Sequence, residues 1–396
     1  MTGPSRRGRL SRRAVLAGVP ALAGAAALGP GPAATAAEPD AARRALPVRG
    51  ADISFTLQEE AAGTTYRRGG VAAPVERILA GYGASHVRLR VWVDPPAGYS
   101  DLADALILAR RARRAGLRLL LDLHYADFWA DPGHQPTPAA WQALDLPGLV
   151  RTVHRYTRDV VAAFADQGTP LAMVAIGNEI TNGMLWPLGQ VYRSDGEHWA
   201  PLAELLRAGV AGVRDAGRRP GGRPLTMIHI DRGGDNAGSR YFFDHILAER
   251  VRFDLIGQSY YPFWHGPLAA LRANLGDLAA RYGKDIVVAE TAYPWTTGNG
   301  DALANSFTSA DQLPDAAAFP PTRAGQAAYF EALRQVIAQV PGGHGAGFFD
   351  WEPEWVPGVG WEPGAGNPND NLTMFDWTGE ALPSMRAFRR PARTTS

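Results

Sequence analysis

Two glutamates that follow apolar runs are the residues of this sequence with the most obvious chemical potential. Glu179 ends "MVAIGNE", and Glu290 lies in "DIVVAETAY". Paired carboxyl groups can hydrolyse a glycosidic bond, because one protonates the leaving oxygen while the other attacks the anomeric carbon or activates water. A carboxyl group next to an apolar run can also have the burial-raised pKa that the acid needs. Spacing alone leaves open that both are ordinary surface residues of loops.

Aromatic residues cluster after the same kind of run and give a second indication. One tryptophan is explained equally well by packing under a loop, but several at one rim favour a cleft that stacks sugar rings. The motifs "YADFWADP", "MLWP", "YYPFWHG", "AYPW" and "FFDWEPEW" supply Trp129, Trp186, Trp264, Trp295 and Trp351.

Other chemistries lack their residues. The sequence has no HExxH, no P-loop, no G-x-S-x-G elbow and no cysteine, which argues against metalloprotease, nucleotide and serine-esterase sites. His124 and His229 could be metal ligands of an amidohydrolase-like barrel. However, no H-x-H pair follows the first apolar run, so we favour histidines that form hydrogen bonds with the protein or the substrate.

The elements that must position these residues form a repeating pattern. Apolar runs alternate with helical segments, such as the one with Leu102, Ala105 and Ala109 before Gly116. This alternation predicts a single (β/α)8 TIM barrel, with a doubly wound sheet as the runner-up. In such a barrel the strand ends carry the chemistry. The expected strands are Gly50–Phe55, His86–Trp92, Arg118–Tyr125, Met173–Glu179, Leu225–Asp231, Phe253–Tyr261, Asp285–Tyr293 and Gly345–Pro353.

Composition and the N-terminus indicate an exported protein without a charged polymer as its partner. The formal net charge is +1 and there is no cysteine, so we expect no nucleic-acid partner and no disulfide. The start "SRRGRLSRRAVLAGVPALAGAAALG" has clustered arginines before a short apolar run. It predicts a signal over residues 1–36, by the twin-arginine route, with no stable membrane anchor. A linker over 37–49 and a barrel over 50–396, expected to be monomeric, would follow.

Many motifs resemble glycoside hydrolase family 53, the secreted arabinogalactan endo-β-1,4-galactanases. The similar segments run in the expected order from Gly50 to about Met385. They are "GADIS", "HVRLRVWVDP", "LLLDLHYADFWADPGHQ", "IGNEITNGMLWP", "RGGDNAGSRYFFD", "SYYPFWHG", "ARYGKDIVVAETAYPW", "WEPEW" and "ALPS". The resemblance implies a clan A barrel that retains the anomeric configuration, with Glu179 as acid/base and Glu290 as nucleophile.

The same resemblance assigns the residues around this pair. Asn178 would bind the sugar 2-hydroxyl, and Arg88 would orient the nucleophile, with Arg90 as an alternative. Trp129 and Trp264 belong to the expected aromatic cleft. Further positions that match cleft-lining residues of the family are His124, His229, Tyr260 and Trp351.

A calcium site is a further feature to which the resemblance points. Bacterial members often bind calcium through a D-x-D-x-H-x-N pattern after the seventh strand, whereas this chain has "NGDALAN" there. Oxygen ligands remain, but fewer charges imply weaker binding. The candidates in this loop, which belongs to the long irregular segment Thr296–Thr322, and in the later "NPND" are Asn299, Asp301, Asn305, Asn367 and Asp370.

The expected activity is therefore endo-hydrolysis of β-1,4-galactan by two glutamates, with no cofactor required for the chemistry. A β-1,4-mannanase or glucanase of the same clan is an alternative. A catalytically inert, glycan-binding barrel is another, although the presence of both glutamates and Asn178 argues against it.

Overall fold

The structure, a computed structural model, describes residues 46–95, 99–217, 222–361 and 365–390. The export signal expected over 1–36 lies outside the described residues. The first strand begins at Val48, where it already pairs with Gly347 of the last strand. Residues 48 and 49 therefore belong to the barrel and not to the linker expected over 37–49.

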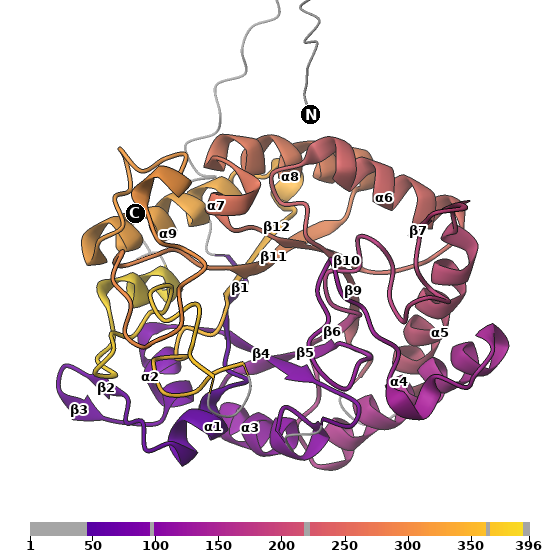
Figure 1. Cartoon of the computed structure of the whole chain (residues 1–396), viewed down its shortest axis with the longest axis horizontal. Coiled ribbons are helices and arrows are strands. Elements are labelled where there is room, and N and C mark those ends of the chain that lie inside the picture. The colour runs from indigo at the N-terminus through magenta and orange to yellow at the C-terminus, as the bar shows by residue number, and fades with distance from the viewer. Residues whose placement is uncertain (1–45, 96–98, 218–221, 362–364, 391–396) are drawn as a thin grey trace, which may run out of the picture. The chain divides into compact units, whose positions relative to one another are not determined.

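Eight parallel strands close into a barrel, with helices in a ring around it (Figure 1). Each strand pairs with the next barrel strand along the chain, and β12 returns to β1. The (β/α)8 prediction is confirmed, and the doubly wound alternative is excluded by the closure of the sheet. The barrel strands are β1 (Val48–Asp52), β4 (His86–Val91), β5 (Arg118–Leu123), β6 (Met173–Ile176), β9 (Leu225–Ile230), β10 (Leu255–Ser259), β11 (Asp285–Thr291) and β12 (Gly345–Asp350).

Alternation along the strands divides the apolar residues between two cores. One set fills the inside of the barrel, and the other lies between the strands and the helices, as expected when both faces of a sheet are covered. The larger outer core includes Val87, Leu89 and Val91 of β4. The inner core consists of Val48, Leu120, Met173, Ala175, Met227, Leu255, Val287, Ala289, Ala346 and Phe349.

The helices begin where the sequence supplies capping residues. The side chains of Asp101 and Asp145 accept hydrogen bonds from the first turns of α3 and α4. Gly168, just after α4, has a φ of 80° that favours glycine. No helix among the described residues is long and apolar enough to cross a membrane. The helices are α1 (Thr56–Ala61), α2 (Val75–Tyr82), α3 (Leu102–Arg114), α4 (Leu146–Asp166), α5 (Trp199–Ala216), α6 (Asn236–Ala248), α7 (Pro262–His265), α8 (Leu268–Tyr282) and α9 (Arg323–Ala338).

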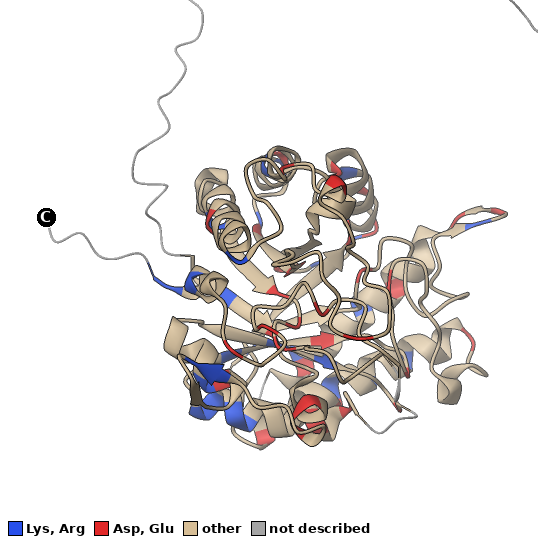
Figure 2. Ribbon diagram, turned by 60° about the vertical axis from the view of Figure 1, so that its left-hand side comes forward, with Lys and Arg blue, Asp and Glu red and all other residues tan. Residues whose placement is uncertain are grey.

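Short elements outside the repeat were not predicted. Two hairpins, β2 (Arg67–Arg68) with β3 (Val71–Ala72) and β7 (Tyr192–Arg193) with β8 (Gly196–Glu197), interrupt the connections after β1 and β6. Charged residues of both signs are spread over the helices, and acidic residues also occur among the strands and inner loops (Figure 2).

Candidate active site

A cavity of about 560 Å³ opens where the barrel strands end, and both candidate glutamates line it. The remaining lining is aromatic and polar, which suits a ligand with apolar ring faces and many hydroxyl groups. The lining residues are His124, Trp129, Ala130, Asp131, Pro132, Asn178, Glu179, Asp231, Tyr261, Trp264, His265, Glu290, Ser306, Trp351, Trp361, Asn369 and Leu372.

A tight turn after β6 directs Glu179 into the cavity. β6 ends at Ile176, Gly177 has a φ of 84°, and Glu179 itself has a φ of 49°. A Cβ at Gly177 would lie 2.6 Å from Ile180 Cγ2, so only glycine fits there. The positive φ of Glu179 is strained for a residue with a side chain, and such strain is common at functional sites. The turn explains why an amide and a carboxyl group follow a buried strand directly.

An irregularity in β11 places Glu290 in the cavity. Its neighbour Ala289 already belongs to the inner core, so strict alternation would turn Glu290 outward. The pairing registers of β10 with β11 and of β11 with β12 both shift at this point. A bulge of this kind redirects a side chain, and Glu290 consequently faces the cavity although it is only 5% exposed.

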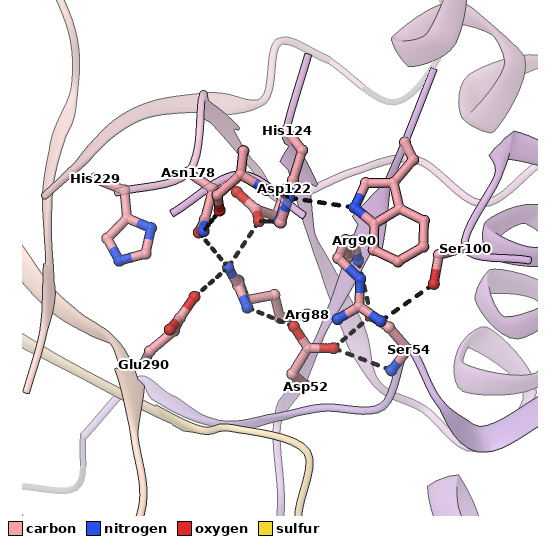
Figure 3. A network of polar contacts seen from close by, with 12 residues as sticks. Asp52, Ser54, Arg88, Arg90, Ser100, Asp122, His124, Asn178, His229 and Glu290 are labelled. Atoms are coloured by element: carbon pink, nitrogen blue, oxygen red, sulfur yellow. Dashed lines mark hydrogen bonds and ion pairs between the residues drawn. The ribbon is translucent and has the colours of Figure 1, made fainter. Parts of the chain in front are cut away.

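Arg88 holds Glu290 from behind (Figure 3). Its Nη2 donates to Glu290 Oε1 at 2.6 Å, to Asp122 Oδ2 at 2.7 Å and to Asn178 Oδ1 at 2.9 Å. Its Nη1 donates to Asp52 Oδ2 at 2.5 Å. The guanidinium group is 1% exposed, so a buried cation is balanced by buried carboxylates. Arg88 does not line the cavity, so it can act on the chemistry only through Glu290 and Asn178.

Arg90 serves a different carboxylate. Its Nη1 donates to Glu352 Oε1 at 2.7 Å, and its guanidinium carbon lies 4.2 Å from the centre of the Trp129 ring. The choice between the two arginines is thereby settled in favour of Arg88 as the partner of Glu290. Arg90 instead packs against the ring of Trp129, which lines the cavity.

The environments of the two glutamates affect the pKa values of their carboxyl groups differently. Burial is the main cause that raises the pKa of Glu179 well above its usual range, and the charges of Glu290 and Asp231 add to it. Burial raises the pKa of Glu290 to about 7, against the opposing effect of Arg88. Tyr261 Oη also donates to Glu290 Oε2 at 3.0 Å. Glu290 therefore ionises first, and the proton stays on Glu179.

Asn178, which precedes Glu179 in the chain, is held by fixed contacts. Its Oδ1 accepts from Arg88, and its Nδ2 donates to the Ala130 carbonyl at 2.8 Å. The side-chain amide lines the cavity with its orientation determined by these bonds. One N–H of Nδ2 remains for a ligand hydroxyl.

The two predicted histidines occupy different positions. His124 lines the cavity, and its Nδ1 accepts from the Ala130 main-chain N–H at 3.2 Å, so its Nε2 carries the proton and donates to Asp122 at 3.0 Å. His229 is fully buried outside the lining, with Nε2 2.8 Å from Ser259 Oγ. Burial lowers the pKa of His229 to about 3, so this ring is neutral. No group of three or more histidine, aspartate or glutamate side chains that could hold a metal ion occurs within the described part of the chain.

Three of the six predicted aromatic residues line the cavity, and Trp186, Trp295 and Tyr260 do not. Trp129 and Trp351 lie at one side with rings 6.3 Å apart, and Trp264 is 61% exposed. Tyr260 is fully buried outside the lining, and its Oη donates to the Gly266 carbonyl at 2.7 Å. Its neighbour Tyr261 faces the cavity in its place, because alternation from Leu255 of the inner core points residue 261 inward.

Sequence reasoning also missed residues that share the cavity. Asp231 accepts a hydrogen bond from Thr181 close to Glu179. Its position just after β9 was visible in the sequence, because it ends one of the apolar runs. Trp361 packs edge-on against Trp129 at 4.5 Å, but it lies in a Gly/Pro-rich loop with no pattern that marks it.

The five residues expected to bind calcium do come together. The main-chain N–H of Asn367 donates to Asp301 Oδ2 at 2.6 Å, and Asn305 Nδ2 donates to Asp370 Oδ1 at 2.8 Å. Asn299 Nδ2 donates to a carbonyl within its own loop at 2.7 Å. Asn305 Oδ1 is buried without a partner, so it could ligate a cation. With two carboxylates among the five, the oxygen set fits a weakly bound calcium ion.

Relatives of known structure share this barrel. The chain superposes on the glycoside hydrolase family 53 catalytic domain of Ignisphaera aggregans with a TM-score of 0.81 and 34% identity, covering 88% of this chain and 96% of that one. A structure from a study of two fungal β-1,4-galactanases matches with a TM-score of 0.76 and 36% identity, over 87% of this chain and all of that one.

Sequence comparisons agree with the structural ones. An arabinogalactan endo-β-1,4-galactanase of Humicola insolens is 36% identical over 353 residues, which are 87% of this chain and 100% of the relative. An arabinogalactan endo-β-1,4-galactanase A of Aspergillus niger is 38% identical over 351 residues, 87% and 95% of the two chains. The sequence model of glycosyl hydrolase family 53 matches residues 48–388. The chain belongs to glycosyl hydrolase family 53.

Proposed function

We propose that the protein is an endo-acting hydrolase of the β-1,4-galactosidic linkages in the galactan of arabinogalactan. The observation that carries the proposal is the asymmetry of the two glutamates in one aromatic cavity. Glu290 contacts the buried guanidinium group of Arg88. Glu179, by contrast, is buried near the acidic side chains of Glu290 and Asp231. The named activities of relatives at 36% and 38% identity support the choice of substrate.

The proposed reaction is a double displacement. Glu290 attacks the anomeric carbon of the bound sugar while Glu179 gives its proton to the glycosidic oxygen, so the bond to the leaving chain breaks and a glycosyl ester forms. Glu179, now ionised, removes a proton from water, which attacks the same carbon and releases Glu290. After the first step Glu179 is ionised and Glu290 is esterified. The second step returns the proton to Glu179 and the negative charge to Glu290, which is the distribution that their unequal pKa values favour.

The surrounding residues stabilise the charge that develops. Asn178, with its remaining N–H, is placed to bond the 2-hydroxyl, a contact that strengthens as the sugar becomes oxocarbenium-like. Arg88 keeps Glu290 ionised and oriented from outside the cavity. The rings of Trp129, Trp264 and Trp351 supply faces on which sugar units can stack.

The test is release of reducing ends from linear β-1,4-galactan, β-1,4-mannan and cellulose by the protein and by Glu179→Ala and Glu290→Ala. We expect activity on galactan alone, reduced more than about a thousandfold in each variant, since each removes a group that acts in the transition state. Activity on mannan or cellulose but not on galactan would contradict the proposed substrate. Activity retained by Glu290→Ala would contradict the mechanism.

Export and a monomeric state remain proposals. The arginine pair Arg12–Arg13 before an Ala-rich apolar run supports a secreted enzyme processed near residue 36 and sent by the twin-arginine route. N-terminal sequencing of the secreted protein from cells with and without a functional twin-arginine pathway tests both points. Sedimentation of the purified protein tests the monomer.

Calcium is proposed as a structural ion only. Asp301, Asn305 and Asp370 would hold it, and when bound it would neutralise the two carboxylates and brace the loop after β11 against the C-terminal segment. None of these three residues lines the catalytic cavity, so the chemistry does not depend on the ion.

A further inference from the structure

A second group of aromatic residues lies outside the catalytic cavity, around the β7–β8 hairpin. Tyr192 and Tyr241 are 38% and 44% exposed, yet both rings have fixed contacts with neighbouring side chains. With Trp199 and Glu197 they form what we call the rim platform. None of the four lines the catalytic cavity.

The carboxylate of the platform is held in one position. Tyr241 Oη lies 3.0 Å from both oxygens of Glu197, and Trp199 Nε1 donates to Oε2 at 2.7 Å. The bond from Trp199 and then the one from Tyr241 lower the pKa of Glu197, so it is ionised. An exposed glutamate normally samples many rotamers. Here its acceptor oxygens are already ordered, which reduces the entropy that a ligand hydroxyl would lose on binding.

The rings are supported from beneath. Trp199 stacks on His245 with ring centres 4.5 Å apart, and Tyr192 meets Trp199 edge-on at 5.9 Å. Tyr192 pairs directly with Glu197 across the hairpin. The platform therefore combines rigid aromatic faces and a fixed acceptor on one surface.

The platform is attached to the segment that carries the proposed acid. The main-chain N–H of Tyr192 donates to Asn182 Oδ1 at 2.8 Å, and Asn182 lies three residues after Glu179. The hairpin and the catalytic turn therefore belong to one connection of the barrel, between β6 and α5. Such connections follow the strand ends, which is also where the cavity opens.

We propose that the rim platform is a second binding site for the galactan chain, separate from the catalytic cavity; this rests on the proposed function. A galactose ring presents the C–H groups of carbons 3, 4 and 5 on one face, because its 4-oxygen is axial. That face can stack on Tyr192 or Tyr241, and hydroxyls at its edge can donate to Glu197. The site adds affinity for long chains through a second point of attachment.

The experiment compares one long and one short substrate. We expect Tyr192→Ala/Tyr241→Ala to lower kcat/KM on polymeric β-1,4-galactan by about three- to tenfold, the range for loss of aromatic stacking. The same variant should keep wild-type kcat/KM on β-1,4-galactotetraose, because we expect the catalytic cavity alone to hold this short chain. Glu197→Gln should reproduce the effect more weakly, because the amide also keeps the rings in place.

Two controls separate binding from folding. Val71→Ala truncates a side chain that is 70% exposed on the other hairpin, and it should change neither activity. Melting temperatures of all variants are measured, and the single substitutions Tyr192→Ala and Glu197→Gln replace the double one if it does not fold.

Each other outcome counts against a named proposal. Unchanged activity of the platform variants on the polymer, or an equal loss on polymer and tetraose, would overturn the second binding site. A wild-type protein inactive on both galactan substrates would overturn the proposed function, and the platform proposal with it.

Discussion

At the scale of single residues, the protonation of the two glutamates depends on the hydroxyl and carboxyl groups near them. Tyr261 and Tyr260 are adjacent and chemically identical, yet one donates to Glu290 and the other to a carbonyl of its own loop. Asp231 carries no bond to either glutamate, but its charge acts on Glu179. Each of these differences leads to a measurable effect.

Tyr261→Phe should reduce activity and shift its pH dependence. The lost hydrogen bond favours the ionised form of Glu290, so its loss raises the pKa of that carboxyl. The nucleophile must be ionised, and the acid limb of the kcat/KM profile should therefore move to higher pH. We expect kcat/KM to fall by about ten- to a hundredfold, since bonds to charged groups contribute about 1.5–3 kcal/mol.

Tyr260→Phe is the matched control for this change. It removes a hydroxyl that bonds the Gly266 carbonyl away from the cavity, so it should cost about 1 kcal/mol of stability and leave the pH profile unchanged. A profile shifted by Tyr260→Phe and not by Tyr261→Phe would contradict the placement of the two rings.

Asp231→Asn should move the opposite limb. The negative charge of Asp231 raises the pKa of Glu179, and its removal lowers that pKa. Because the first step needs Glu179 protonated, the alkaline limb of kcat/KM should move to lower pH. Asp235→Asn, which neutralises the capping carboxylate of α6 outside the cavity, should leave the limb in place. An alkaline limb that is the same in both variants would refute the coupling of Asp231 with Glu179.

At the scale of elements, the strands and long helices were predictable and the irregular turns were not. The apolar runs located all eight barrel strands within a few residues at each end, because both faces of a parallel sheet are buried. The β7–β8 hairpin escaped notice because strands of two residues leave no alternation to detect.

Local irregularity also limited the prediction of the site. Arg88 and Arg90 lie two residues apart on one face of β4, so alternation could not tell them apart. Glu290 faces the cavity because of a bulge that the sequence does not announce. Tyr261, by contrast, could have been chosen by counting in twos from Leu255.

The turn after β6 gives a prediction for an element. In Gly177→Ala the new Cβ would clash with Ile180 at a φ that alanine disfavours. The turn must shift and carry Glu179 with it, so kcat should fall by about a hundredfold or more. Gly168→Ala has a similar φ of 80° but open space around its Cβ. It should lose about 1–2 kcal/mol of stability and no activity. Equal activity of the two variants would argue against a role of the turn after β6 in positioning Glu179.

The loop after β11 gives a second prediction for an element. Addition of millimolar CaCl₂ to protein treated with EGTA should raise the melting temperature by a few degrees, because an ion that binds only the folded state stabilises it. Asp301→Asn should abolish this rise, since it removes one of the two carboxylates. Identical melting curves of the unaltered protein with and without calcium would rule out the ion. Calcium-dependent loss of activity without a change in melting would contradict a purely structural role.

At the scale of the whole molecule, buried carboxyl groups should make stability depend on pH. Burial raises the pKa of Glu59 to about 8 and, with the charge of Asp52, that of Glu352 to about 8. A folded-state pKa above the unfolded value means that the folded protein keeps protons that the unfolded chain loses. The contribution of these groups to the free energy of unfolding should therefore be largest below about pH 4.5. It should decline as the pH rises to about 8.

Urea unfolding at a series of pH values measures this decline. Glu59→Gln replaces the protonated carboxyl group with a neutral amide, so the slope should become smaller by about 1.4 kcal/mol per pH unit between pH 5 and 8. Glu60→Gln, an exposed neighbour, serves as the control and should leave the slope nearly unchanged. A slope that is the same in protein and Glu59→Gln would show that Glu59 is ionised when folded.

The four contacts of Arg88 have a consequence for how this enzyme can evolve. One guanidinium group joins Glu290, the proposed nucleophile, to Asp52, Asp122 and Asn178, so a substitution at any of them changes the surroundings of Glu290. Effects of such substitutions are coupled and not additive. Sequence drift at these positions is therefore constrained by epistasis, and adaptation to new polysaccharides has to proceed through the loops that carry Trp264 and Trp361, which lie outside the network.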